Sequence, residues 1–177
     1  QMSRYKKQQQ PETTSKKASA TQRAPVKSDT APHTRINSGQ LIEQQRAKYA
    51  LKAVNQAIHQ SEDEHAYKHT ELKAYIRRFP GMVQMNGFGQ AVAFYYSKRA
   101  TSKAYGAVYT IVEEWLCGPD QVYSSYLHDG PHPLLTAITS EDQNSYRAAQ
   151  AETQALMLWI KKFADALILN PDQANTD

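Results

Sequence analysis

Apolar residues recur at steps of three and four from residue 38 onward, which is the spacing that places them on one face of an α-helix. The pattern predicts a first helix from Ser38 to about Gln60, with Ser38 as its N-cap. Residues 61–64 should cap a second helix, which is expected to stop at Pro80-Gly81 because both residues disfavour a helix interior. A third helix should then cover residues 82–96.

The same spacing continues through the second half of the chain. A fourth helix should begin at Thr101-Ser102 and end before Gly118-Pro119, and short helices are expected at 121–127 and 134–139. The last helix has the clearest pattern and should end at Asn170-Pro171. Its predicted buried seam comprises Tyr146, Ala149, Thr153, Leu156, Ile160, Phe163 and Leu167.

No segment alternates β-branched and polar residues as a half-buried strand would. The sequence therefore predicts an all-α fold, a compact helical bundle of five to seven helices including the short ones. Gly87 and Gly89 fall inside the third predicted helix, where glycine lowers helix propensity. The expected reason for both glycines is the close approach of another backbone.

Charge is distributed unevenly along the 177 residues. The net charge is +4, but residues 1–39 hold eight Lys or Arg against two acids, whereas the rest holds thirteen basic and fifteen acidic residues. Residues 1–39 also lack large aliphatic residues and any periodicity, so we predict a disordered basic tail followed by one helical domain over 40–177. Whether the tail contacts phosphates or is only a solvated extension stays open.

The residue patterns that support catalysis are missing. Cys117 is the single cysteine, so no disulfide can form within the chain, and its apolar neighbours predict a buried thiol. His65 and His69 lie one helical turn apart, but no third ligand accompanies them. We expect no catalytic residue, cofactor or metal. The chain also has no membrane-length apolar run and no signal peptide at its first residues, which predicts a cytoplasmic protein without a membrane partner.

Binding is the remaining interpretation, and it rests on basic residues. If several converged on one face they could follow a phosphate backbone without recognising its sequence. Helix ends also favour cations for structural reasons, so a solvated surface is the alternative. The basic residues in question are Arg46, Lys48, Arg77, Arg78, Lys98, Arg99, Lys103, Arg147, Lys161 and Lys162.

Three blocks of sequence, taken together and in order, carry more information than composition. They are RAKYAL at residues 46–51, QMNGFGQAVAF at 84–94, and YR at 146–147 followed by ETQALMLWIKKFA at 152–164. From residue 40 to about 169 the chain resembles the small all-helical subunit of the type III-B CRISPR effector, the Cmr complex. The family usually has Gln-Asn-Gly-Leu-Gly-Gln in the second block, so Met85 and Phe88 depart from it while keeping apolar character.

The resemblance implies a non-catalytic subunit that stacks with further copies of itself into a short filament beside guide and target RNA. Other Cmr effector subunits would be its partners and would perform cleavage and signalling. Within the matching blocks, the implied RNA-backbone contacts are Arg46, Lys48, Arg147, Lys161 and Lys162. Lys98, Arg99 and Lys103 are added on charge alone. Core positions are expected for Trp159 and Phe163, because large aromatics on a helical seam usually belong to the core.

Two other functions remain compatible with the sequence. One is a helical nucleic-acid binder whose affinity comes mainly from the tail. The other is an adaptor that contacts only protein, its cations serving helix ends and solvation. Removing the tail, or measuring salt-dependent RNA binding, would separate these alternatives.

Overall fold

The computed structural model describes residues 38–63 and 67–169, and within them it contains six α-helices, one short 3-10 helix and no strand. The all-α prediction is confirmed. The predicted tail lies outside the described residues, so its disorder stays a prediction. The elements are α1 (Ser38–Asp63), α2 (His69–Asn86), α3 (Phe88–Lys98), α4 (Lys103–Leu116), η1 (Ser124–Tyr126), α5 (Pro133–Ser140) and α6 (Gln143–Leu167).

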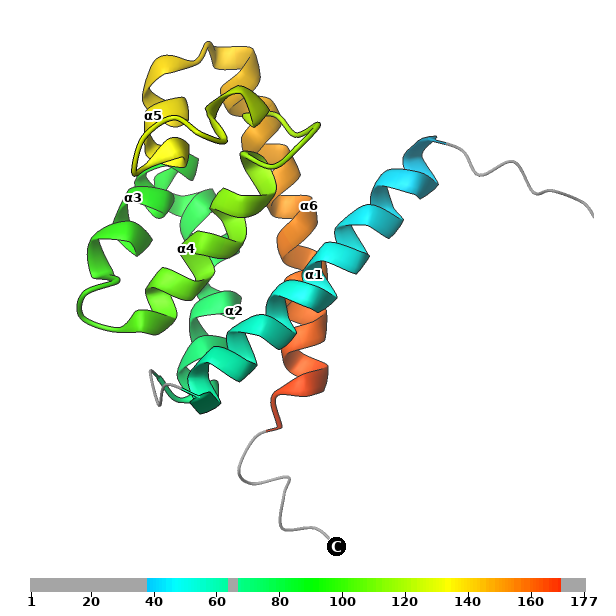
Figure 1. The fold of residues 1–177 in the computed structure, drawn as a ribbon, viewed down its shortest axis with the longest axis vertical. Coiled ribbons are helices and arrows are strands. Elements are labelled where there is room, and N and C mark those ends of the chain that lie inside the picture. The colour runs from blue at the N-terminus through cyan, green and yellow to red at the C-terminus, as the bar shows by residue number, and fades with distance from the viewer. Residues whose placement is uncertain (1–37, 64–66, 170–177) are drawn as a thin grey trace, which may run out of the picture. The chain divides into compact units, whose positions relative to one another are not determined.

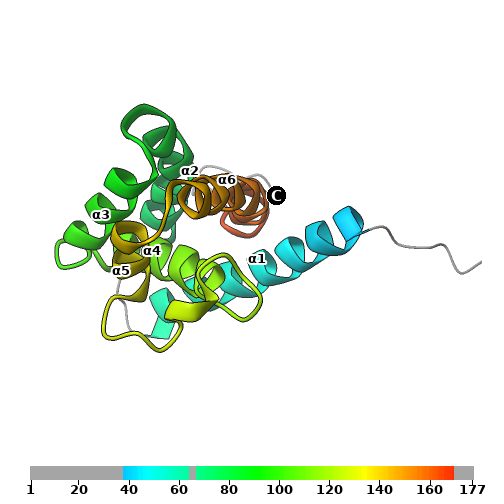
Figure 2. The ribbon, with the colours of Figure 1, turned by 90° about the horizontal axis from the view of Figure 1, so that it is seen from above.

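The long C-terminal helix α6 organises the bundle. It packs against α1 on one side and α2 on another, while α2, α3 and α4 pack against one another (Figures 1 and 2). Every α-helix contributes buried apolar side chains to one continuous core, which includes Val54, Ile76, Tyr95, Leu134 and Leu156. Helices that are far apart in sequence, α1 and α6 above all, therefore lie side by side.

The break predicted at Pro80-Gly81 is wrong, because α2 continues through both residues to Asn86. Phe79 and Val83 are each only 1% exposed, so packing holds the turns on both sides of the proline against the core. The chain breaks instead at Gly87, which has φ +87° and ψ 157°. Side-chain-bearing residues rarely adopt that conformation, so Gly87 separates α2 from α3.

The two glycines near the start of α3 have different roles. A Cβ added at Gly87 would meet no atom within 4 Å, so the packing role expected for Gly87 is wrong. A Cβ at Gly89 would lie 3.1 Å from Ile138 Cγ2 and 3.3 Å from the Tyr146 hydroxyl oxygen. Gly89 is therefore closely approached, but by side chains of α5 and α6 and not by another backbone, so the predicted kind of contact is wrong.

Other helix boundaries follow the predictions to differing degrees. Ser102 caps α4 as predicted by accepting a hydrogen bond from the Ala104 amide. The short helix expected at 121–127 is reduced to the single 3-10 turn η1, and α5 matches the helix expected at 134–139. Residues 61–63, expected to cap the second helix, instead form the last turn of α1. Asn170-Pro171, the predicted end of the last helix, lies outside the described residues, and α6 ends at Leu167.

The predicted seam of the last helix is mostly buried. Its four central members are inaccessible to solvent, whereas Leu167 is 43% exposed. Trp159 and Phe163 are half-buried against the core edge and lie nearly parallel, with ring centroids 5.8 Å apart. Cys117 is buried as expected, and burial raises the pKa of its thiol to about 12. The fully buried seam residues are Ala149, Thr153, Leu156 and Ile160.

Candidate nucleic-acid interface

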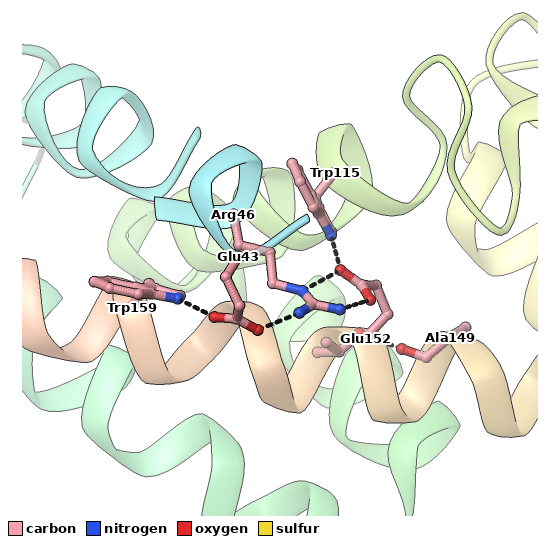
Figure 3. A network of polar contacts seen from close by, with 7 residues as sticks. Glu43, Arg46, Trp115, Ala149, Glu152 and Trp159 are labelled. Carbon is pink, nitrogen blue, oxygen red and sulfur yellow. Dashed lines mark hydrogen bonds and ion pairs between the residues drawn. The ribbon is translucent and has the colours of Figure 1, made fainter. Parts of the chain in front are cut away.

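Arg46 is held between two carboxylates of its own chain (Figure 3). Its Nε donates to Glu152 Oε1 at 2.8 Å and its Nη2 to Glu152 Oε2 at 2.5 Å, a two-point pair that joins α1 to α6. Nη1 donates to Glu43 one helical turn earlier. Only 12% of the Arg46 side chain is exposed. The two carboxylates therefore neutralise the charge of the Arg46 guanidinium within the protein.

Two tryptophans complete the same network. Trp115 Nε1 on α4 donates to Glu152 Oε1 at 3.0 Å, and Trp159 Nε1 on α6 donates to Glu43 Oε2 at 2.9 Å (Figure 3). The hydrogen bond from Arg46 is the main reason that the pKa of Glu152 is lowered, and the bond from Trp159 is the main reason that the pKa of Glu43 is lowered. Both carboxylates are thus stabilised in their charged form.

Four of the other predicted RNA contacts are exposed and come from α1 or α6. Lys48 lies on α1, and Arg147, Lys161 and Lys162 lie on the side of α6 that faces solvent. Within the described part of the chain, none of the four forms an ion pair. Lys162 Nζ lies 5.2 Å from the centroid of the Trp159 ring. All four side chains are exposed to solvent, and the charge of Lys162 also helps to lower the pKa of Glu43.

The remaining three predicted contacts gather where α3 turns into α4. Arg99 places its guanidinium carbon 3.5 Å from the centroid of the Tyr96 ring, and Lys98 Nζ lies 5.8 Å from that of Phe94. Lys103 is the first residue of α4. The α3–α4 turn lies apart from helix α6 in both views (Figures 1 and 2). The structure therefore divides the eight predicted residues into two groups and does not bring them together.

A charge pattern overlooked in the sequence explains the second group. Residues 72–112 contain six Lys or Arg and no Asp or Glu. Two of the six secure the end of α6: Lys73 Nζ donates to the Ile168 carbonyl at 2.6 Å, and Arg77 pairs with Asp165 at 2.7 Å. Arg78, Lys98 and Arg99 form no ion pair with any described residue. Counting charges over windows of the sequence would have revealed this one-signed segment.

The described residues contain no group of three His, Cys, Asp or Glu side chains that could hold a metal. Among the helices of that same part of the chain, none combines the length and the apolar character that a membrane span requires. His65, half of the weak histidine pair, lies outside the described residues. A cavity of about 200 Å³ between α1 and α4 has Ala53, Ala57 and Ala107 among its lining residues.

Comparison with known families identifies a match over most of the bundle. The family model described as "CRISPR-associated protein (Cas_Cmr5)" matches residues 42–167. That range runs from the first turns of α1 to the last residue of α6 and contains all three blocks noted in the sequence. It also contains both groups of exposed cations.

Proposed function

Because the chain belongs to the Cmr5 family of CRISPR-associated proteins, small subunits of the type III-B Cmr complex, we propose that it stacks with copies of itself along the guide and target RNA and contacts the RNA backbone. The subunit takes no part in the chemistry of cleavage. The larger subunits of the complex are its protein partners. The RNA sequence is recognised by pairing between guide and target, so this subunit needs only to hold the backbone.

The observation that carries the proposal is a set of exposed cations that form no ion pair with any described residue. Arg147, Lys161 and Lys162 on α6, and Lys98 and Arg99 beside the α3–α4 turn, form no ion pairs with described residues. Spaced cations of this kind neutralise phosphates without selecting a base. Stacked copies add their few contacts through effective concentration, so one weak site per copy is sufficient.

Arg46 has a different part in the proposal. Its guanidinium is engaged by Glu152 and Glu43 and its side chain is largely buried, so binding a phosphate would require breaking those pairs. We propose that Arg46 supports RNA binding only indirectly, by fixing α1 against α6. Lys48, which is exposed one half-turn further along α1, keeps its proposed contact with the backbone.

The test uses a Cmr complex reconstituted around the full chain. Lys161→Gln with Lys162→Gln is compared with Lys52→Gln and Lys68→Gln, which remove the same charge from exposed positions outside the candidate groups. Target-RNA affinity is measured across a salt series. The α6 pair should flatten the slope of log affinity against log salt by about 0.7 to 0.9 for each phosphate that is no longer neutralised, whereas the control pair should not.

If the α6 pair, and equally variants of the α3–α4 group, left the slope unchanged in an intact complex, the proposed RNA contact would be wrong. An adaptor that touches only protein would then be the better explanation. Retention of each variant in the complex is checked by size-exclusion chromatography before the affinity is measured.

A further inference from the structure

Arg99 follows the last residue of α3, and three contacts hold it there. Its guanidinium carbon lies 3.5 Å from the Tyr96 ring centroid, and its Nη1 donates to the Tyr96 carbonyl at 2.7 Å. The third contact is with the backbone of α4, where a Cβ at Gly106 would approach Arg99 Cβ to 3.3 Å. The absence of a side chain at Gly106 lets Arg99 lie directly against α4.

The ring beneath the guanidinium is also fixed from several sides. The Tyr96 hydroxyl pairs with Nδ1 of His132 at 2.7 Å, just before α5. The centroid of the Tyr109 ring on α4 lies 5.0 Å from that of Tyr96, and the Tyr109 hydroxyl donates to Glu113 on the same helix. Elements α3, α4 and the residue before α5 together orient the platform on which Arg99 lies.

Arg99 differs from the other arginines of the described residues. Arg46 and Arg77 are held by carboxylates, whereas Arg78 and Arg147 have neither an ion pair nor a hydrogen bond there. Arg99 is held in place but without a carboxylate. A cation at a helix end interacts favourably with the helix dipole, and the Tyr96 carbonyl uses one of the five guanidinium N–H donors. Four N–H donors of the Arg99 guanidinium and the face turned away from Tyr96 remain for another ligand.

A fixed guanidinium that has no counter-ion among the described residues fits an anion from outside this part of the chain. Arginine suits phosphate because its planar donors match two phosphate oxygens at once. Fixing the side chain beforehand removes part of the entropy that binding would otherwise cost. The surrounding segment, residues 72–112, contributes no acid that would repel a phosphate, and Lys98 places a second cation one residue away.

We infer that Arg99, stacked on Tyr96, contacts a phosphate of the RNA backbone, and that the RNA-facing side of this subunit includes the α3–α4 turn. The inference rests on the proposed function, since it takes RNA as the anion, and it deepens that function by naming a contact and the residue that positions it. Tyr96 is the positioning residue.

The experiment compares variants of the full chain in the reconstituted complex, with a target RNA complementary to the guide as the probe. Arg99→Gln should weaken binding about tenfold, the effect of one charge-assisted contact, and flatten the salt slope by about 0.7 to 0.9. Arg99→Lys keeps the charge, so it should restore the slope while leaving affinity reduced. Lys52→Gln is the matched control for the removal of one exposed charge.

Two further variants test the platform without changing any charge. Tyr96→Leu removes the aromatic ring and should lower affinity by roughly the factor seen for Arg99→Lys, since neither variant keeps the stacked arrangement. Tyr96→Phe keeps the ring and should bind within about twofold of the wild type. If Tyr96 had a purely structural role, its variants would change the thermal midpoint of the complex. The RNA affinities of Tyr96→Leu and Tyr96→Phe would then be nearly equal.

The outcomes separate the inference from the function on which it rests. A slope flattened by the Lys161/Lys162 variant but not by Arg99→Gln would overturn the inference and leave the proposed function standing. No change from either variant would overturn both. Failure of Arg99→Gln to enter the complex, with an unchanged melting curve of the isolated chain, would assign the guanidinium to an acidic surface of a partner protein and would also overturn the inference.

Discussion

Replacing Glu152 with glutamine tests whether the polar network between α1 and α6 stabilises the bundle. The carboxylate accepts hydrogen bonds from Arg46 Nε, Arg46 Nη2 and Trp115 Nε1, at 2.8, 2.5 and 3.0 Å. Glutamine has the same size, but it carries no charge and its amide nitrogen cannot accept. At least one of the three donors then has no acceptor, and Arg46 keeps only the exposed Glu43 as a counter-ion.

The size of the expected destabilisation follows from these hydrogen bonds. A hydrogen bond to a charged group contributes about 1.5 to 3 kcal/mol, and removing one partner of a fully buried ion pair costs about 3 to 5 kcal/mol. The Arg46 and Glu152 side chains are each 12% exposed, so solvent reduces the larger figure. We expect Glu152→Gln to lower the free energy of unfolding by about 2 kcal/mol.

Urea unfolding followed by circular dichroism at 222 nm measures this destabilisation. Tryptophan fluorescence is less suitable, because Trp115 and Trp159 belong to the network and their signal would change with the substitution itself. Glu62→Gln is the control, since the ion-pair partners of Glu62 among the described residues are histidine nitrogens at 3.6 and 3.8 Å, which carry a charge only when protonated. A decrease below about 0.5 kcal/mol, within the range of ordinary surface substitutions, would refute the structural role of the network.

The same network predicts a pH dependence. Because the Arg46 hydrogen bond lowers the pKa of Glu152 below its ordinary value of 4.5, the stabilisation is complete above that value and is lost as the pH falls through the lowered pKa. The stability difference between wild type and Glu152→Gln should therefore narrow below about pH 4. A constant difference between pH 7 and pH 3 would contradict the sign of the shift.

Three further changes have expected outcomes. Lys73→Met removes the buried ammonium that donates to the Ile168 carbonyl, and it should destabilise the chain by about 1 to 3 kcal/mol, whereas Lys68→Met on the surface should not, as urea unfolding would show. Gly87→Ala should destabilise by about 1 kcal/mol or more because φ is +87°, while Gly81→Ala within α2 should stabilise by up to about 1 kcal/mol. Deleting residues 1–35 should leave assembly with the other Cmr subunits intact in a pull-down, and collapse of RNA binding on deletion would favour the tail-driven alternative.

Local sequence rules predicted the elements that depend on local interactions. The stripe of apolar residues in α6 and the Ser102 cap of α4 involve residues a few positions apart, so their pattern is visible in the sequence. The boundary between α2 and α3 is different. Pro80 is tolerated because Phe79 and Val83 pack into the core, and Gly87 is required because of the direction in which α3 must leave. Neither the tolerance of Pro80 nor the requirement for glycine at position 87 can be predicted from residue type alone.

The candidate site, too, depends on contacts between residues that are far apart in the sequence. Arg46 and Glu152 are separated by 106 positions, and nothing in either sequence block indicates that they meet. The sequence assigns Arg46 to RNA because it lies in a matching block, whereas the structure places its guanidinium between two carboxylates. The platform beneath Arg99 is equally invisible in the sequence, since it combines Tyr96 of α3, Gly106 of α4 and His132, the residue before α5.

Net charge is therefore a poor guide to whether this fold offers sites for phosphate. Residues 40–177 have two more acids than bases, which by itself predicts weak attraction to phosphate. Yet their acids are concentrated outside residues 72–112, and the carboxylates of Glu152 and Asp165 neutralise cations where helices must be joined. The exposed surface is positive where a cation has no carboxylate partner among the described residues, as at Arg99. A fold can thus be acidic on average and still offer positive sites, provided that its carboxylates pair with cations between helices, as Glu152 and Asp165 do here.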